Sequence, residues 1–223
     1  MITAQIATLP ERVDNLEKTV ASLIDQVDQL FVALNGHKEV PSFLENNRKI
    51  IFIVMDNKLG DGAKFYDSDT REGYILTCDD DLVYPQGYAR YMVEGIKKHG
   101  GIVTMLGKQY DTRPIASYGG GYTRIFNCLN SVRMDAEVDV GGTGVMGWHS
   151  DTIKIDPFSF PRKNMADIWV AKLAYEQGVP ITVLAHPKGY FAHKTYPWRI
   201  WVKDRDNKYQ TEIMNSFLKP ALT

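Results

Sequence analysis

The stretch YILTCDDDLVYP, residues 74–85, places three consecutive carboxylates directly after a short apolar segment. Residues 74–78 have the pattern of a buried strand, so Asp79, Asp80 and Asp81 would emerge at its carboxyl end. Neighbouring carboxylates repel one another, and burying them without partners is costly. An exposed turn explains such a triplet, because Asp is common in turns. A divalent cation explains it equally, because it converts the repulsion into chelation.

On both sides of this stretch, apolar strand patterns alternate with amphipathic helix patterns. This alternation predicts an α/β fold with a central, mostly parallel sheet flanked by helices, which binds ligands at the carboxyl ends of its strands. The run KIIFIVM is apolar on both faces, as expected for a strand covered on both sides. The expected strands are 2–8, 30–34, 49–55, 74–78 and 102–106, and the expected helices are 11–26 and 86–99.

The second half of the chain begins with a glycine-rich segment, residues 110–144, that is too long for a simple connection. A helix at 164–177, a strand at 181–184 and a last helix at 207–218 are expected after it. The sequence shows no internal repeat and no obvious linker. We therefore expect one domain over residues 1–223.

The composition is that of an ordinary globular protein, with 44% apolar and 24% charged residues. The net charge of −1 argues against a general nucleic-acid-binding surface, although the basic, aromatic C-terminal part leaves a DNA-directed enzyme open. No apolar run approaches the roughly 20 residues that span a bilayer, and the N-terminus lacks the pattern of a signal peptide. Cys78 and Cys128 lack metal-ligand spacing, so we expect a reducing, cytoplasmic location.

Four motifs extend the argument: ATLPER at 7–12, GDGAKF at 60–65, LTCDDDLVYP at 76–85 and NMADIW at 164–169. Their order resembles that of the nucleotide-sugar-dependent glycosyltransferases of the GT-A fold, of the inverting family 2 type. The resemblance implies a single Rossmann-like GT-A domain, with residues 1–109 as the nucleotide-binding half and 110–223 as the acceptor and catalytic half. It also implies transfer of a sugar from a nucleoside-diphosphate sugar, expected to be a UDP-sugar, to an acceptor hydroxyl with inversion.

The resemblance assigns the donor to strand ends and loops. Thr8 and its neighbours would hold base and diphosphate, Asp56 would read the base, and Lys64 would approach ribose or phosphate. Asp79 would contact the ribose. Arg12 and Lys64 have a plain alternative as solvated cations, and the glycine loop around Gly142 has one as a flexible turn. The residues implied in nucleotide-sugar binding are Ala7, Thr8, Arg12, Asp56, Lys64, Asp79, Asp80 and Gly142.

The Asp-x-Asp spacing can direct Asp79 and Asp81 to one side, with Asp80 pointing away. The resemblance then makes Asp81 and His193 the ligands of Mn²⁺ or Mg²⁺, hard cations that take few protein ligands and share a diphosphate. Asp167 would be the general base that deprotonates the acceptor. The resemblance places a second carboxylate before it, but this sequence has Ala166 there. A plain alternative for Asp167 is an acidic residue favoured in the first turn of a helix.

Two other functions remain open. Residues 79–83 also satisfy the Asp-x-Asp-x-Thr/Val pattern of haloacid-dehalogenase-type phosphohydrolases, with Asp79 as nucleophile, although that motif usually lies on the first strand. A non-catalytic carbohydrate-binding protein is the second alternative. A nucleotidyltransferase is less favoured, because the first strand lacks a glycine-rich loop. The acceptor is a glycan or another hydroxyl, and a modified DNA base, as a phage enzyme would use, stays open.

Overall fold

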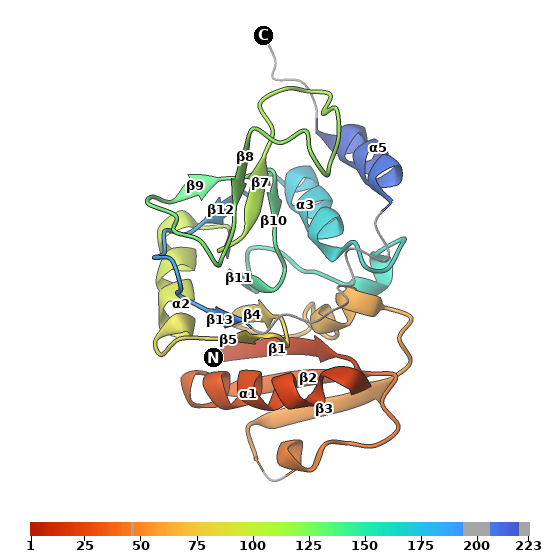
Figure 1. The fold of residues 1–223 in the computed structure, drawn as a ribbon, viewed down its shortest axis with the longest axis vertical. Coiled ribbons are helices and arrows are strands. Elements are labelled where there is room, and N and C mark those ends of the chain that lie inside the picture. The colour runs from red at the N-terminus through yellow and green to blue at the C-terminus, as the bar shows by residue number, and fades with distance from the viewer. Residues whose placement is uncertain (46, 194–205, 219–223) are drawn as a thin grey trace.

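The computed structural model describes residues 1–45, 47–193 and 206–218. Its centre is an eight-stranded sheet in the order β3-β2-β1-β4-β11-β6-β12-β9 (Figure 1). Strands β1 to β4, β6 and β12 run in one direction, whereas β11 and β9 run antiparallel to them. The bounds are β1 Ile2–Thr8, β2 Gln29–Asn35, β3 Ile50–Met55, β4 Tyr74–Cys78, β6 Ile102–Thr104, β9 Ala136–Glu137, β11 Val145–His149 and β12 Ile181–Val183.

Helices cover the two faces of this sheet. Helices α1 (Val13–Leu23) and α2 (Tyr88–His99) pack on one face, in a core that takes Leu76 and Cys78 from β4. Helices α3 (Ala166–Glu176) and α5 (Asn207–Phe217) share a second core with Ile75 and Trp148. Side chains of a strand alternate between faces, so β4 contributes to both cores. The predicted α/β fold with a mostly parallel sheet flanked by helices is confirmed.

Most of the expected elements form within one or two residues of their predicted bounds. The first helix is shorter than predicted, because short 3₁₀ turns at Pro10–Arg12 and Ile24–Gln26 flank α1. The prediction of a doubly covered third strand is wrong. Strand β3 is the outermost strand of the sheet, and Ile51 and Val54 are 41% and 46% exposed. An apolar run does not reveal whether a strand lies at the edge of a sheet.

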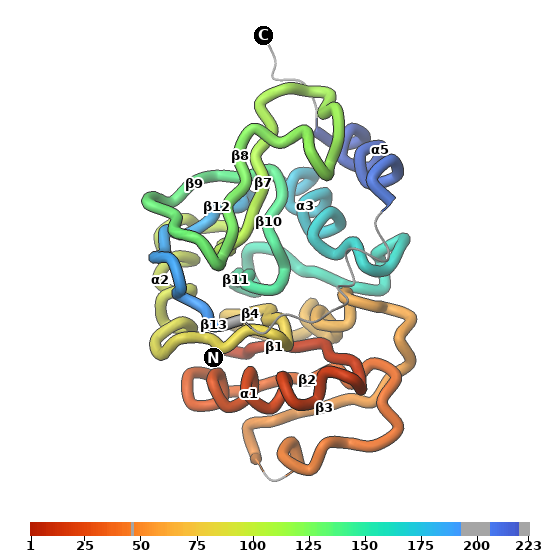
Figure 2. The backbone as a smooth tube through the Cα atoms, viewed as in Figure 1, coloured from red at the N-terminus to blue at the C-terminus, as the bar shows by residue number. Residues whose placement is uncertain are grey.

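The segment expected to be irregular contains several strands. A three-stranded antiparallel sheet forms in the order β10-β7-β8 from Val140–Gly141, Gly107–Gln109 and Arg124–Phe126. Strand β11 follows and enters the main sheet between β4 and β6. In Figure 2 the chain passes from the red and orange N-terminal strands at the bottom to green β7 and β8 and blue α5 at the top.

Two short strands close the acidic segment. Strand β5 (Leu82–Val83) pairs with β13 (Ala192–His193) in an antiparallel ladder that sets His193 opposite Leu82. The basic, aromatic residues 194–205 that follow lie outside the described residues. Within the part of the chain that is described, no helix is long and apolar enough to cross a membrane.

Candidate functional site

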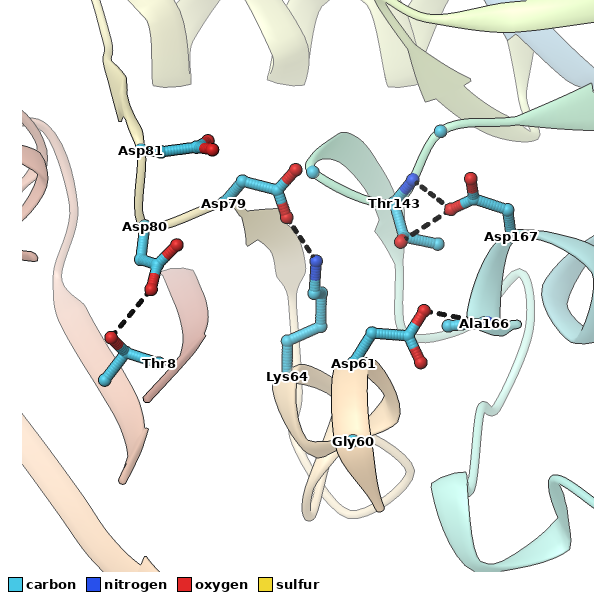
Figure 3. A network of polar contacts seen from close by, with 12 residues as sticks. Thr8, Gly60, Asp61, Lys64, Asp79, Asp80, Asp81, Thr143, Ala166 and Asp167 are labelled. Atoms are coloured by element: carbon cyan, nitrogen blue, oxygen red, sulfur yellow. Dashed lines mark hydrogen bonds and ion pairs between the residues drawn. The ribbon is translucent and has the colours of Figure 1, made fainter. Parts of the chain in front are cut away.

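The acidic triplet lies at the carboxyl ends of neighbouring parallel strands. Strands β1 and β4 pair in register with Ile6 opposite Cys78, so the residues that follow β4 lie next to Thr8. Figure 3 shows Asp79 and Asp81 directed to one side and Asp80 turned toward Thr8. This is the alternation that the Asp-x-Asp spacing indicates.

Asp80 is held by the protein itself. It is 1% exposed, and its Oδ2 accepts a hydrogen bond of 2.7 Å from Thr8 Oγ1 while its Oδ1 pairs with Arg12. Burial raises the pKa of Asp80 to about 7, although Arg12 and Thr8 act in the opposite direction. Both carboxylate oxygens have protein donors. A nucleotide that contacts Asp80 would therefore share an oxygen that already accepts a hydrogen bond or ion pair from the protein.

The other two members of the triplet also lie beside cations. Lys64 Nζ is 2.5 Å from Asp79 Oδ1, and Arg12 Nη2 is 3.5 Å from Asp81 Oδ2. The side chain of Asp79 is 45% exposed, whereas that of Lys64 is only 6% exposed. The protein therefore supplies two cations against the repulsion of its three aspartates. Repulsion within the triplet alone no longer requires a metal ion.

Lys64 belongs to a short 3₁₀ helix, η4 (Gly60–Phe65), that brings one further carboxylate. Burial lowers the pKa of Lys64, but Asp79, Asp61 and Asp167 together outweigh burial and raise it. Burial also raises the pKa of Asp61 to about 6, against the effect of Lys64. Asp61 was not predicted from the sequence. The spacing of Asp61 and Lys64 could have revealed it, because residues three apart share one face of a 3₁₀ helix.

The start of α3 meets this cluster from the opposite side. Asp167 Oδ1 accepts hydrogen bonds from Thr143 N at 2.8 Å and from Thr143 Oγ1 at 2.7 Å. Asp61 Oδ2 accepts a hydrogen bond of 3.1 Å from Ala166 N, as Figure 3 shows. The predicted base, the predicted sugar loop and the acidic strand end therefore lie within one network. Thr143 was not predicted, and its neighbours Gly142 and Gly144 gave no indication of its side chain.

Two glycines of this loop allow a close approach. A Cβ at Gly142 would lie 2.4 Å from Leu106 Cδ2, and one at Gly144 would lie 1.9 Å from Asp79 Oδ2. Distances this short exclude a side chain unless a neighbour moves. The predicted role of Gly142 in sugar binding is untested, whereas Gly144 leaves room for the Asp79 carboxylate.

Three predicted residues lie outside this network or reach it only through the backbone. Asp56 follows β3 with a side chain that is 60% exposed and paired with Lys58. Ala7 packs in a small core beneath β1 and β2. The β13–β5 ladder sets the backbone of His193 opposite the residue that follows Asp81.

Polar groups at the end of β2 were not predicted, because Asn35-Gly36 was interpreted only as the close of a strand. Asn35 Nδ2 donates to the carbonyl of Gly60 at 3.0 Å, while Asn35 Oδ1 and His37 Nε2 are buried without a hydrogen-bond partner among the described residues. Burial lowers the pKa of His37, against a hydrogen bond to the Leu9 backbone. These atoms add two polar groups to the same edge of the sheet.

The acidic and basic side chains of the site determine whether it can hold a metal ion. In the described ranges, no group of three or more His, Cys, Asp or Glu is arranged to hold an ion. Among the described residues around η4, β4 and α3, carboxylates nevertheless outnumber cations. The carboxylates are Asp61, Asp79, Asp80, Asp81 and Asp167, and the cations are Arg12 and Lys64. This donor set fits a hard cation that takes most of its ligands from a bound anion and from water.

The sequence matches no family model and no curated protein. Among solved structures, S. aureus TarS 1–349 in complex with UDP-GlcNAc is similar, with a TM-score of 0.55 and 13% identity over 97% of this chain and 71% of that chain. A 2-C-methyl-D-erythritol 4-phosphate cytidylyltransferase from Thermus thermophilus gives a TM-score of 0.48 and 14% identity, over 97% of this chain and 96% of that chain. The likeness to TarS confirms the Rossmann-like fold of the GT-A type. The inverting family 2 type remains a prediction.

Proposed function

We propose that this protein is a transferase that uses a nucleotide sugar, and more specifically a glycosyltransferase that moves a sugar from a UDP-sugar to an acceptor hydroxyl. One observation carries the proposal. The carboxyl ends of β1 and β4, the buried cation of η4 and the start of α3 converge on one polar site. Parallel α/β sheets bind their ligands at this edge. The similarity of the fold to TarS, which was solved with UDP-GlcNAc, supports the choice of donor.

The donor would lie along the strand ends. Asp79, already oriented by Lys64, accepts hydrogen bonds from the ribose hydroxyls, while Lys64 and Arg12 face the diphosphate. The buried atoms Asn35 Oδ1 and His37 Nε2 offer hydrogen-bond partners to the base. Among the described residues, an incoming anion meets more carboxylates than cations, so a bound cation would favour its binding.

Asp81 and His193 would hold that charge as Mn²⁺ or Mg²⁺. The ion, when bound, neutralises the charge that grows on the departing nucleoside diphosphate. Asp167 then removes the proton of the acceptor hydroxyl, and its carboxylate is held in position by the two hydrogen bonds that Oδ1 accepts from Thr143. Attack from the face opposite the leaving group inverts the anomeric centre. The acceptor is a hydroxyl of a glycan or of another molecule, with a modified DNA base as a further candidate.

A thermal-shift screen tests the donor and the ion together. We expect UDP and UDP-GlcNAc to raise the melting temperature of the protein further when Mn²⁺ is present than when it is absent, and Asp81→Asn to abolish this Mn²⁺-dependent gain while leaving the unliganded melting temperature unchanged. An Mn²⁺-dependent gain from UDP that Asp81→Asn leaves unchanged would refute the metal assignment. Hydrolysis of a phosphomonoester that Asp79→Asn abolishes would favour the phosphohydrolase instead.

A further inference from the structure

Asp61 places a carboxylate beside residue 166, where this chain has alanine in place of an acidic residue. The resemblance places an acidic residue before Asp167, where this chain has Ala166. In the structure Asp61, 105 residues earlier in the chain, accepts a hydrogen bond from the Ala166 amide at 3.1 Å. The Oδ1 atom of the same carboxylate is buried. A negative charge next to the first turn of α3 is thus present, but it comes from η4.

The contact between η4 and the start of α3 is specifically built. The Asp61 amide donates to Asn164 Oδ1 at 3.2 Å, in the opposite direction to the bond from Ala166 to Asp61. Gly60 has a φ of +58°, and a Cβ there would lie 2.3 Å from Asn164 Oδ1. Asn164 itself has a φ of +61°. Two left-handed residues therefore face each other across the contact. Gly60 adopts this φ without steric cost, whereas for Asn164 it costs free energy that the surrounding contacts compensate.

Asp61 also belongs to the charge network of the donor side. Lys64 lies between carboxylates of different elements, with Asp79 at 2.5 Å and with Asp61 and Asp167 close enough to raise its pKa. The groups that face Asp61 are Lys64 from η4, Asp167 from α3 and Tyr118 from the segment after β7. A shift of Lys64 toward a bound diphosphate would therefore be felt by Asp61 and, through the Ala166 amide, by α3.

We propose that Asp61 is a positioning residue that replaces the carboxylate missing at residue 166. It fixes the first turn of α3, and with it Asp167, and it transmits occupancy of the donor site from Lys64 to that helix. The proposal rests on the proposed glycosyl transfer, because Asp167 needs a defined position only if it acts on an acceptor. It adds a residue and a coupling that the transfer reaction alone does not require.

Two substitutions separate the hydrogen bond from the charge. Asp61→Ala removes both, whereas Asp61→Asn keeps an oxygen for the Ala166 amide but cannot balance Lys64. Asp206→Asn is the matched control, because Asp206 accepts a hydrogen bond from the first turn of α5 and pairs with Arg162. Three measurements apply to each variant: hydrogen exchange of the amides of residues 166–169 with and without UDP and Mn²⁺, the Kd of UDP, and the release of UDP from UDP-GlcNAc.

We expect Asp61→Ala to speed exchange at residues 166–169 and to lower kcat for UDP release by about 10-fold or more, toward the ~100-fold that a misplacement of 1 Å can cost, with the UDP Kd within about 3-fold. Asp61→Asn should keep the slow exchange of the free protein but lose the further slowing that UDP causes in the wild type. It should also lose any rise of kcat with pH near 6, where Asp61 ionises. Asp206→Asn should leave all three measurements unchanged.

The proposal is overturned if both Asp61 variants show wild-type exchange and kcat, or if the UDP Kd weakens as much as kcat falls, since Asp61 would then be a donor contact. Should Asp61→Ala not fold, Asp61→Asn decides alone through the response of exchange to UDP. Failure of the proposed function is distinguishable, because wild-type protein would then bind no UDP in the presence of Mn²⁺. If Asp206→Asn lowers kcat and speeds exchange as much as the Asp61 variants do, the effect is one of helix capping in general, and the proposal is also overturned.

Discussion

Gly144→Ala should disturb the donor site through one defined collision. A Cβ at residue 144 would lie 1.9 Å from Oδ2 and 2.2 Å from Cγ of Asp79. Both distances are far below an ordinary contact, so the carboxylate must move. The backbone has little freedom to yield instead, because the Asp79 amide donates to the Gly144 carbonyl at 3.0 Å and Tyr84 Oη donates to the same carbonyl at 2.6 Å.

The magnitude follows from the partner that Asp79 leaves behind. Lys64 is 4% exposed and would lose the carboxylate that now lies 2.5 Å from its Nζ. Breaking a fully buried ion pair costs about 3–5 kcal/mol. The Asp79 side chain is 45% exposed, so solvent screens the pair, and Lys64 keeps Asp61 nearby. We therefore expect Gly144→Ala to lower the free energy of unfolding by only about 1–2 kcal/mol. A similar loss in UDP binding corresponds to roughly a 5- to 30-fold weaker Kd.

Chemical denaturation and calorimetry with UDP and Mn²⁺ measure the two effects. Gly120→Ala is the control, because a Cβ at Gly120 meets nothing within 4 Å. The double variant Asp79→Ala/Gly144→Ala isolates the collision, since the atoms that the new Cβ meets are absent from it. We expect Gly144→Ala to cost almost nothing in the Asp79→Ala background. If it costs as much there as in the wild type, the collision with the carboxylate is not the cause and the reasoning is wrong.

Three further predictions address single carboxylates. Asp79→Ala should weaken UDP binding equally with and without Mn²⁺, because Asp79 is assigned to the ribose; a loss confined to Mn²⁺ would make it a metal ligand. Asp167→Asn should lower turnover by at least ~100-fold with UDP binding nearly unchanged, as checked by UDP release and calorimetry, and wild-type turnover would remove it as the base. Asp80, with a pKa raised from 3.8 to about 7, binds its proton more tightly in the folded state, so its contribution to the free energy of unfolding should fall by about 3 kcal/mol as pH rises from 4 to 7. Asp80→Asn should flatten this decline in denaturation curves, and an unchanged slope would contradict the assignment.

The fold was predictable because its determinants are local. Short apolar strand segments and 3.6-period helices alternate along the first half, and alternation of this kind specifies a parallel sheet. Strand β11 was missed for a physical reason. Its position between β4 and β6 depends on pairing with strands that are distant in sequence. Gly147 in its centre also interrupts the apolar pattern. Glycine fits there because a Cβ would lie 2.5 Å from Leu76 Cδ2. The exposure of β3 was not predicted for a related reason, because the sequence of one strand does not determine the order of strands in a sheet.

The candidate site likewise contains residues that could be predicted from the sequence and partners that could not. The acidic triplet is contiguous in sequence, so its chemistry was visible at once, and Lys64 and Asp167 followed from the order of motifs. The partners of these residues were not visible, because each comes from a distant segment. Arg12 reaches Asp80 across 68 residues, and Asp61 reaches the Ala166 amide across 105. When only neighbours in sequence were counted, an exposed turn and a chelated metal ion therefore explained the triplet equally well. With the contacts known, the proposal of an ion rests on the site as a whole, because its described carboxylates exceed its described cations and the proposed donor is itself an anion.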